Sequence, residues 1–280
     1  MSDNFASVVG RTATDGVDLA PGPADRLAAA LDFDDLPFAP GAPLPHAWHW
    51  LYFLSAPKAS TVGPDGRGAA GDLIPHFEGL NRMWAGGAFT FGKPPEFGET
   101  LARTSTITAI TPKDGKSGRL LLATVGHQLA TPSGGTLSER QDIVFRERKP
   151  GPSKHPDGER ATLQARWTRT LTPDEVLLFR FSALTYNSHR IHYDHPYTTV
   201  TEGYPGLIVH GPLTAILLLD SIRRNLPGRA LRSFDYRAIR PLFCGSPLTL
   251  KGAASADGKF VEVWAEDHQG FVAMRGSGEI

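Results

Sequence analysis

Alternation of apolar and polar residues predicts several strands in each half of the chain. Such alternation is typical of strands that are buried on one face. The strand-like runs are 119–130 and 141–146 in the first half, and 259–266 and 271–275 in the second. An Asp-Gly pair precedes the first run of each half, at 114–115 and at 257–258, which is typical of a tight hairpin turn. We therefore predict antiparallel hairpins in both halves.

The two halves also share a short motif: proline, three residues, glycine, two residues, leucine. It spans 94–101 in the first half and 241–248 in the second. Alternating aromatic residues precede the motif in each half, at Phe89 and Phe91 and then at Phe234 and Tyr236. A shared order of pattern elements predicts an internal duplication.

Each half is further expected to contain one short helix and one very apolar helix. The short helices are predicted at 23–31 and 173–184, the second one with a capping Thr172 and with Pro173 at its first position. The apolar helices are predicted at 46–54 and 212–224. A helix that is apolar on every side must be enclosed by its own domain. We therefore predict an α+β fold in which a sheet curls around a central helix, made twice and paired side by side.

This duplication divides the chain into a first domain, 1–150, and a second domain, 160–280. The stretch 149–160 contains three prolines and mixed charge, which is typical of a linker. Segment 57–74 is rich in glycine and proline and is predicted to be a surface insertion.

Composition narrows the possible partners. The chain has 280 residues, of which 40% are hydrophobic, enough for a sizeable core. Its 29 basic and 29 acidic residues balance, so no broad basic surface would attract nucleic acid or an anionic membrane. The single cysteine, Cys244, excludes an internal disulfide, and the N-terminus lacks the pattern of a signal peptide. We expect a soluble, cytoplasmic protein.

The densest group of reactive side chains directly follows the helix predicted at 173–184. It reads Asn-Ser-His-Arg-Ile-His-Tyr-Asp-His over residues 187–195. Further along the chain, His210-Gly211-Pro212 opens the second apolar helix. Glycine followed by proline at this position leaves backbone N–H groups exposed at the positive end of the helix.

These two segments suit the addition of water to a 2-enoyl thioester. Negative charge builds up on the thioester oxygen as the enolate forms, and N–H donors at a helix N-terminus can stabilise it. The attacking water must lose a proton and the α-carbon must gain one. A histidine can serve in either transfer.

The sequence resembles the MaoC-like hydratases and dehydratases, a family with a double hot-dog fold. The family motif, Asp-x-Asn-Pro-(Ile/Leu)-His with a later His-Gly, corresponds to 187–192 and to His210-Gly211 here. Segments 82–87 and 202–206 resemble the type 2 hydroxyacyl-thioester dehydratase branch, which includes hydratases of mesaconyl-CoA and itaconyl-CoA. The resemblance covers nearly the whole chain.

This resemblance implies a cofactor-free hydro-lyase that acts on an acyl-CoA, with a branched C5 dicarboxyl acyl group implied by the nearest branch. It also implies a homodimer that pairs through sheet edges. The catalytic motif lies in the second half alone, so the first half is expected to supply the acyl pocket.

One departure from the family motif changes the expected chemistry. The family's catalytic aspartate corresponds to Asn187, whose amide cannot accept a proton at neutral pH. We therefore expect His192 to be the acid/base and Asn187 to hold the attacking water, with Asp194 or His189 in place of the missing carboxylate. The substrate-binding groups are then expected to be Gly211, His210, His189 and Arg190.

Several alternatives remain open at this stage. The histidines of 187–195 could bind a metal or serve only the structure, although their spacing is not that of a helical zinc motif. Arg190, Arg237 and Arg240 could hold coenzyme A phosphates or be ordinary solvated charges. Trp48 and Trp50 are expected in the core. A hot-dog thioesterase and a non-catalytic acyl-CoA-binding module are the competing functions.

Overall fold

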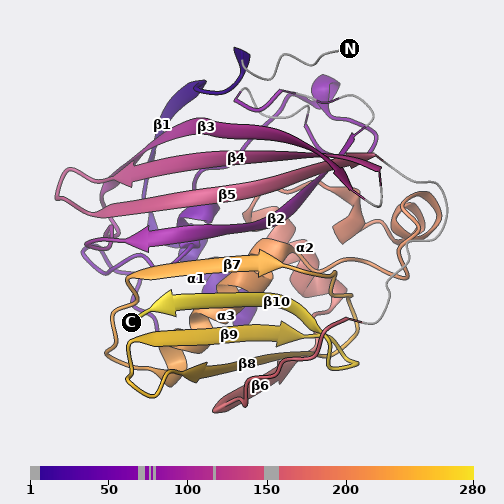
Figure 1. Cartoon of the computed structure of the whole chain (residues 1–280). Helices are drawn as coiled ribbons and strands as arrows, with labels where there is room; N and C mark the ends of the chain where they lie inside the picture. Colours follow the sequence, from indigo (N-terminus) through magenta and orange to yellow (C-terminus); the bar gives the residue numbers. More distant parts are fainter. Residues whose placement is uncertain (1–6, 69–72, 76, 78–79, 116–117, 148–157) are drawn as a thin grey trace.

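The computed structural model of the protein describes residues 7–68, 73–75, 77, 80–115, 118–147 and 158–280, and all its strands form one antiparallel sheet. Ten strands follow one another in the order β1-β3-β4-β5-β2-β7-β10-β9-β8-β6 (Figure 1). The strands of the first half are β1 (Thr12–Asp18), β2 (Leu80–Phe91), β3 (Thr100–Gly115), β4 (Gly118–Ala130) and β5 (Thr136–Glu147). Those of the second half are β6 (Trp167–Leu171), β7 (Ser233–Ala238), β8 (Leu248–Ala254), β9 (Phe260–Glu266) and β10 (Val272–Glu279).

The strand order confirms the repeated pattern that the sequence predicts. From its outer edge to the centre, the first half runs through its first, third, fourth, fifth and second strands, and the second half does the same. The shared motif also matches in conformation, because Gly98 and Gly245 both have a positive φ, 92° and 75°, in the turns before β3 and β8. Glycine adopts this conformation without steric cost.

The halves meet along β2 and β7, which pair from Gly86–Arg237 to Thr90–Ser233. The backbone is tightly packed at this seam: a Cβ added at Gly86 would collide with the Tyr236 carbonyl oxygen. Phe89 and Phe234 lie opposite each other in this register and are both fully buried. The seam is therefore part of the core.

Helix α3 (Gly211–Asn225) lies against β8, β9 and β10 and is the central helix of the second half. Its buried residues run without interruption from Leu213 to Ile222, as expected for an enclosed helix. Helices α1 (Pro21–Leu31) and α2 (Glu175–Leu184) contact each other and lie with α3 behind the sheet in Figure 1. Short 3-10 segments, Trp48–Leu51, Ala59–Thr61 and Arg190–His192, and a π-turn, Tyr197–Thr201, complete the helical elements.

The prediction of a long apolar helix at 46–54 is wrong. Only Trp48–Leu51 is helical, as a 3-10 turn, and Ala47 before it has a left-handed φ of 66°. The segment is short because its side chains are held individually: Trp48 stacks on Phe33 and Phe38, and Trp50 donates a hydrogen bond to Glu139. Trp48 is buried in the core, as the sequence predicts, and Trp50 is half-buried.

The start of α2 also differs from the prediction. The cap is Asp174 rather than Thr172, because the Asp174 carboxylate accepts a hydrogen bond from the Leu177 N–H at 2.8 Å. Pro173 therefore precedes the helix and does not occupy its first position.

Most of the predicted linker, 148–157, lies outside the described residues. None of the described helices is long and apolar enough to cross a membrane.

Candidate active site

The loop 187–195, here called the histidine loop, is anchored to the end of α2. Tyr186 adopts a left-handed φ of 50°, and the Asn187 N–H then donates to the Ser182 carbonyl at 2.8 Å. This turn reverses the chain and brings the histidine loop back beside the start of α3.

His192 lies within this loop and has one fixed tautomer. Its Nδ1 is 2.7 Å from the Ile208 carbonyl oxygen, which can only accept, so Nδ1 carries the proton and Nε2 holds the free lone pair. The side chain is 7% exposed, and burial lowers its pKa to about 4, against the opposing effect of the Ile208 hydrogen bond. At neutral pH this imidazole is therefore an uncharged base.

The ring of His192 stacks on that of His210, with centroids 3.6 Å apart. His210 is the N-cap residue of α3 and is fully buried, with its Nε2 2.8 Å from the Ser182 hydroxyl. Burial, together with the neighbouring His192 and His189, keeps the pKa of His210 well below its usual value. The structure thus brings the histidine loop and the mouth of α3 together, as the sequence predicts.

The mouth of α3 is open at Gly211. A Cβ at this position would meet no atom of the described structure within 4 Å. The first N–H groups of a helix have no acceptor within the helix, and they carry its positive partial charge. An oxygen atom of a ligand can therefore approach the Gly211 backbone next to the His192 ring.

Asn187 and His189 lie in the same loop as His192, and they contact each other. The Asn187 side-chain oxygen accepts the His189 N–H at 3.1 Å, which leaves the amide NH₂ to donate. The His189 ring stands edge-on to that of His192, at 5.6 Å between centroids. Burial, the charge of Arg67 and the neighbouring His192 lower the pKa of His189 to about 2, so this ring is neutral.

Asp194 and Arg190 bind each other rather than the open space. Two guanidinium nitrogens of Arg190 donate to Asp194 Oδ2 at 2.9 and 2.7 Å, and Asp194 Oδ1 accepts the Tyr197 N–H. The third nitrogen of Arg190 donates to the Pro64 carbonyl, and the guanidinium covers the Tyr197 ring at 4.1 Å. These contacts favour a positioning role for both residues over the catalytic and substrate-binding roles that the sequence suggests.

Part of segment 57–74, predicted to be a surface insertion, instead packs on the histidine loop. The Asp65 carbonyl accepts the Arg190 N–H at 2.8 Å, and the Gly66 carbonyl accepts the Ser188 hydroxyl at 2.5 Å. Gly66 is buried, with a positive φ of 84°, and a side chain there would collide with the Ser188 carbonyl. The glycine at position 66 is the sequence feature that permits this close approach. The composition of segment 57–74 alone did not indicate it.

The same segment brings positive charge to the site. Arg67 pairs with Asp65 and donates to the carbonyl oxygen of Arg82 on β2 at 2.5 Å. The charge of Arg67 lowers the pKa of both His189 and His192 and adds to the effect of burial on Arg82. Neither arginine was singled out from the sequence.

The first half contains a second buried polar cluster that the sequence did not indicate. Glu139 accepts hydrogen bonds from Trp50 and Gln141 and lies 2.8 Å from His49 Nε2. Burial alone would raise the pKa of Glu139, but the charge and hydrogen bond of His49 lower it to about 2. His127 is close enough for its charge to act on Glu139 as well.

The remaining candidate residues have structural partners or lie at the surface. Arg240 pairs with Asp267 at 3.2 Å, whereas Arg237 is exposed. Trp84 donates to the Gly86 carbonyl and packs edge-on against Trp50. Within the described ranges, no three histidine, cysteine or acidic side chains are arranged to hold a metal ion.

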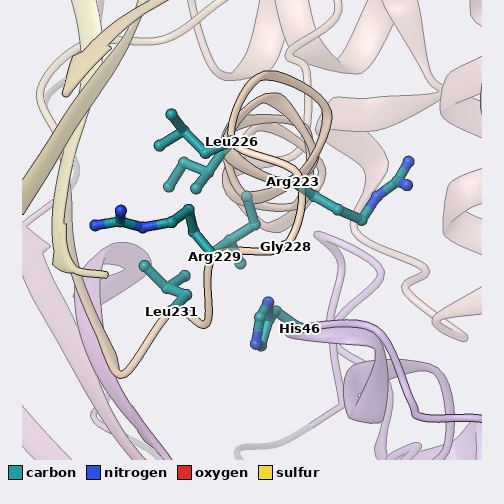
Figure 2. A pocket seen from close by; sticks show the side chains of 8 residues that line it. His46, Arg223, Leu226, Gly228, Arg229 and Leu231 are labelled. Atoms are coloured by element: carbon teal, nitrogen blue, oxygen red, sulfur yellow. The ribbon is translucent and has the colours of Figure 1, made fainter. Parts of the chain in front are cut away.

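A small pocket at the other end of α3 is not part of this site. It is lined by His46, Leu226, Arg229 and neighbouring residues and has a volume of about 80 Å³ (Figure 2). A helix of 15 residues is about 22 Å long, so this pocket lies far from Gly211.

Comparison with known proteins identifies the family of the chain. A family model described as hydroxyacyl-thioester dehydratase type 2 matches residues 47–244. The chain is 40% identical over 260 residues to mesaconyl-C(4)-CoA hydratase of Chloroflexus aurantiacus, covering 92% of this chain and 91% of that protein.

Solved structures show the same fold at low identity. A MaoC-like dehydratase from Phytophthora capsici superimposes with a TM-score of 0.72 at 16% identity, covering 99% of this chain and 97% of the other. A Mycobacterium tuberculosis protein described as a double hot-dog fold gives a TM-score of 0.57 at 15% identity, covering 98% and 97%.

Proposed function

Because the chain belongs to the hydroxyacyl-thioester dehydratase type 2 family, we propose that it hydrates a branched C5 dicarboxyl 2-enoyl-CoA, such as mesaconyl-CoA, at the site around His192. The protein is a double hot-dog enzyme of the hydro-lyase class, which adds water reversibly to an enoyl thioester. The finer substrate assignment takes its support from the 40% identity to a mesaconyl-C(4)-CoA hydratase.

The single observation that carries the site assignment is the position of the His192 ring at the mouth of α3. With Nδ1 donating to Ile208, the Nε2 lone pair is free to accept a proton from water as its oxygen attacks the β-carbon. The same nitrogen, once protonated, can return that proton to the α-carbon. One histidine thus serves both transfers, and no net proton is consumed.

The Gly211 N–H is proposed to stabilise the enolate oxygen. Charge on the thioester oxygen increases toward the transition state, so a donor fixed at a helix N-terminus stabilises the transition state more than the substrate. Open space at Gly211 supports this role. The fully buried His210 positions His192 by ring stacking, and it is the N-cap residue of α3.

Asn187 is proposed to orient the water through its amide NH₂. Since Asp194 is bound to Arg190, we assign this pair to fixing the loop, and His189 to shielding the site as a neutral ring. Because the pKa of His192 is low and no described carboxylate is its partner, the imidazole is a weak base. Proton transfer to it therefore depends on exact placement of the water.

The first half, within the proposed domain 1–150, is proposed to supply the acyl pocket. At the position of α3, the first half has the four-residue 3-10 turn Trp48–Leu51, whose Trp50 packs against Trp84 of β2. Pairing into a homodimer through the outer strands β1 and β6, and a cytoplasmic location, stay predictions.

The test is a turnover screen with crotonyl-, itaconyl- and mesaconyl-CoA, followed by the stereochemistry of the product. Loss of enoyl-thioester absorbance without release of free thiol is expected. Thiol release would instead indicate a thioesterase, and tight binding without either signal would indicate a non-catalytic module.

A further inference from the structure

Arg82 is a cation on the inner face of the first half of the sheet. It lies two residues before Trp84 on β2, and the Trp84 ring packs against Trp50 and Tyr236. Side chains two residues apart along a strand share a face. The cross-strand partner of Arg82 is Phe145, which is buried in the core.

The guanidinium of Arg82 has no anionic partner. Among the described residues, no carboxylate or carbonyl oxygen accepts a hydrogen bond from it, and the neighbouring charge that acts on it is the like charge of Arg67. By contrast, the half-buried Arg190 is paired with Asp194. Arg82 is half-buried as well, and holding a cation at a partly desolvated position without a counter-ion is unfavourable, so a purely structural role gives no reason to keep it there.

Arg82 is also connected to the site around His192. Its carbonyl binds Arg67, and the chain next to Arg67 is hydrogen-bonded to the histidine loop through Asp65 and Gly66. The charge of Arg67 acts on both Arg82 and His192. The backbone at Arg82 is therefore linked through Arg67 to the loop that carries His192.

We propose that Arg82 binds the free carboxylate of a dicarboxylic enoyl thioester and so selects this substrate class. The proposal rests on the proposed hydratase function. A guanidinium matches a carboxylate with two parallel hydrogen bonds, and the bound carboxylate supplies the missing counter-charge. An acyl chain ending in a methyl group would leave the cation unpaired, which disfavours monocarboxylic substrates.

The geometry favours an acyl carboxylate over a coenzyme A phosphate. Arg82 lies near the start of β2, and its neighbours on that face are Trp84 and Phe145. Such surroundings suit a short, partly apolar acyl group more than the highly charged, hydrated phosphates of the coenzyme.

The test compares Arg82→Gln and Arg82→Lys with wild type on mesaconyl-C4-CoA and crotonyl-CoA. We expect Arg82→Gln to lower the ratio of kcat/KM for the dicarboxylic over the monocarboxylic thioester about 100-fold, the size of a charge-assisted bidentate contact. Arg82→Lys should recover part of this ratio, because lysine keeps the charge but cannot form the two parallel hydrogen bonds of a guanidinium. The thermal midpoint of the unliganded Gln variant should not fall, since no native contact is lost.

Arg140→Gln is the matched control. Arg140 lies on the neighbouring strand β5, but its guanidinium is exposed and paired with Asp142 and Asp235. This substitution should leave the ratio unchanged.

The possible failures can be told apart. Equal loss of kcat/KM for both thioesters in Arg82→Gln would overturn the carboxylate assignment and indicate a contact with the coenzyme or a structural role. If wild type hydrates neither thioester, the proposed function fails. In that case, calorimetry measures the binding of the same two thioesters to wild type and to Arg82→Gln. A fall in the ratio of the two affinities in the variant supports the Arg82 proposal, and an unchanged ratio overturns it.

Discussion

In the second half, the Val209 N–H donates to the Leu242 carbonyl just before α3 begins. In the first half, the Leu44 N–H donates to the Pro95 carbonyl at the equivalent place, and only the turn Trp48–Leu51 follows. Counted from these bonds, Pro45 and His46 occupy the positions of His210 and Gly211. One copy thus has a long helix with an open mouth, and the other has lost both.

The difference shows how a duplicated fold can divide its tasks. Stability requires both halves of the sheet, because each contributes one strand of the buried β2–β7 seam, whereas the proposed reaction requires one helix mouth and one base. The shortened helix of the first half leaves part of its inner face to the polar groups around Glu139 and to Arg82. In the function and the Arg82 role that we propose, chemistry and recognition lie in opposite halves.

The largest expected effect comes from removing the base of the second half. His192→Ala should lower kcat for hydration about 1,000-fold, within the range of lost acid/base catalysis. His127→Ala is the comparison, since His127 is a buried histidine of the first half. Steady-state rates on a dicarboxylic enoyl-CoA check this prediction. Similar losses of kcat in both variants would contradict the proposed division of tasks between the two halves.

Removing the charge of Glu139 should act on stability and not on chemistry. The pKa of Glu139 is lowered on folding from 4.5 to about 2, so its ionised form stabilises the fold above pH 4.5, and this contribution is lost as the pH falls toward 2. We expect Glu139→Gln to lower the free energy of unfolding by about 2–3 kcal/mol at pH 7.

Denaturant unfolding of both forms between pH 7 and pH 2 checks this prediction. The difference between wild type and Glu139→Gln should shrink below pH 4.5, whereas kcat at neutral pH should change little. A large loss of kcat with unchanged unfolding would place Glu139 in the catalytic machinery instead.

Closing the helix mouth should give an intermediate effect. Gly211→Val should reduce kcat/KM about 10- to 100-fold, because the side chain occupies the space through which the thioester oxygen approaches. The thermal midpoint should change little, since a side chain there meets open space. Gly206→Val is the control, because Gly206 also faces open space outside α3; an equal loss there would argue against the oxyanion role.

The smallest effect is expected for Asn187→Asp. An aspartate keeps the acceptor for the His189 N–H and can still bind water, so kcat should stay within about tenfold of wild type. Its pH–rate profile is informative as well. A new ionisation that raises kcat well above wild type would show that the active site benefits from the carboxylate it lacks.

The strand pattern and the second helix could be predicted because their signals are local. The strands follow from alternation and Asp-Gly turns, and the helix predicted at 212–224 follows from its apolar run Ile216 to Leu219. The helix expected at 46–54 could not be excluded in the same way, since its apolar residues pack through individual aromatic contacts with Phe33 and Phe38 that no periodicity encodes.

The site could be predicted in part for a similar reason. His192, His210 and Gly211 lie close in sequence to elements that the pattern indicates. Arg67 acts on the site from the other half and does not lie near 187–195 in sequence, so only the folded chain reveals it. The partnership of Arg190 with Asp194 likewise depends on the loop conformation.

The β2–β7 seam has a consequence for how a ligand enters. Glycine at Gly86 lets the two backbones approach so closely that sliding or opening at this line would break the continuous ladder and expose Phe89 and Phe234. A hinge between the halves is therefore mechanically disfavoured. A ligand is therefore expected to reach the site around His192 without a change in the angle between the two halves.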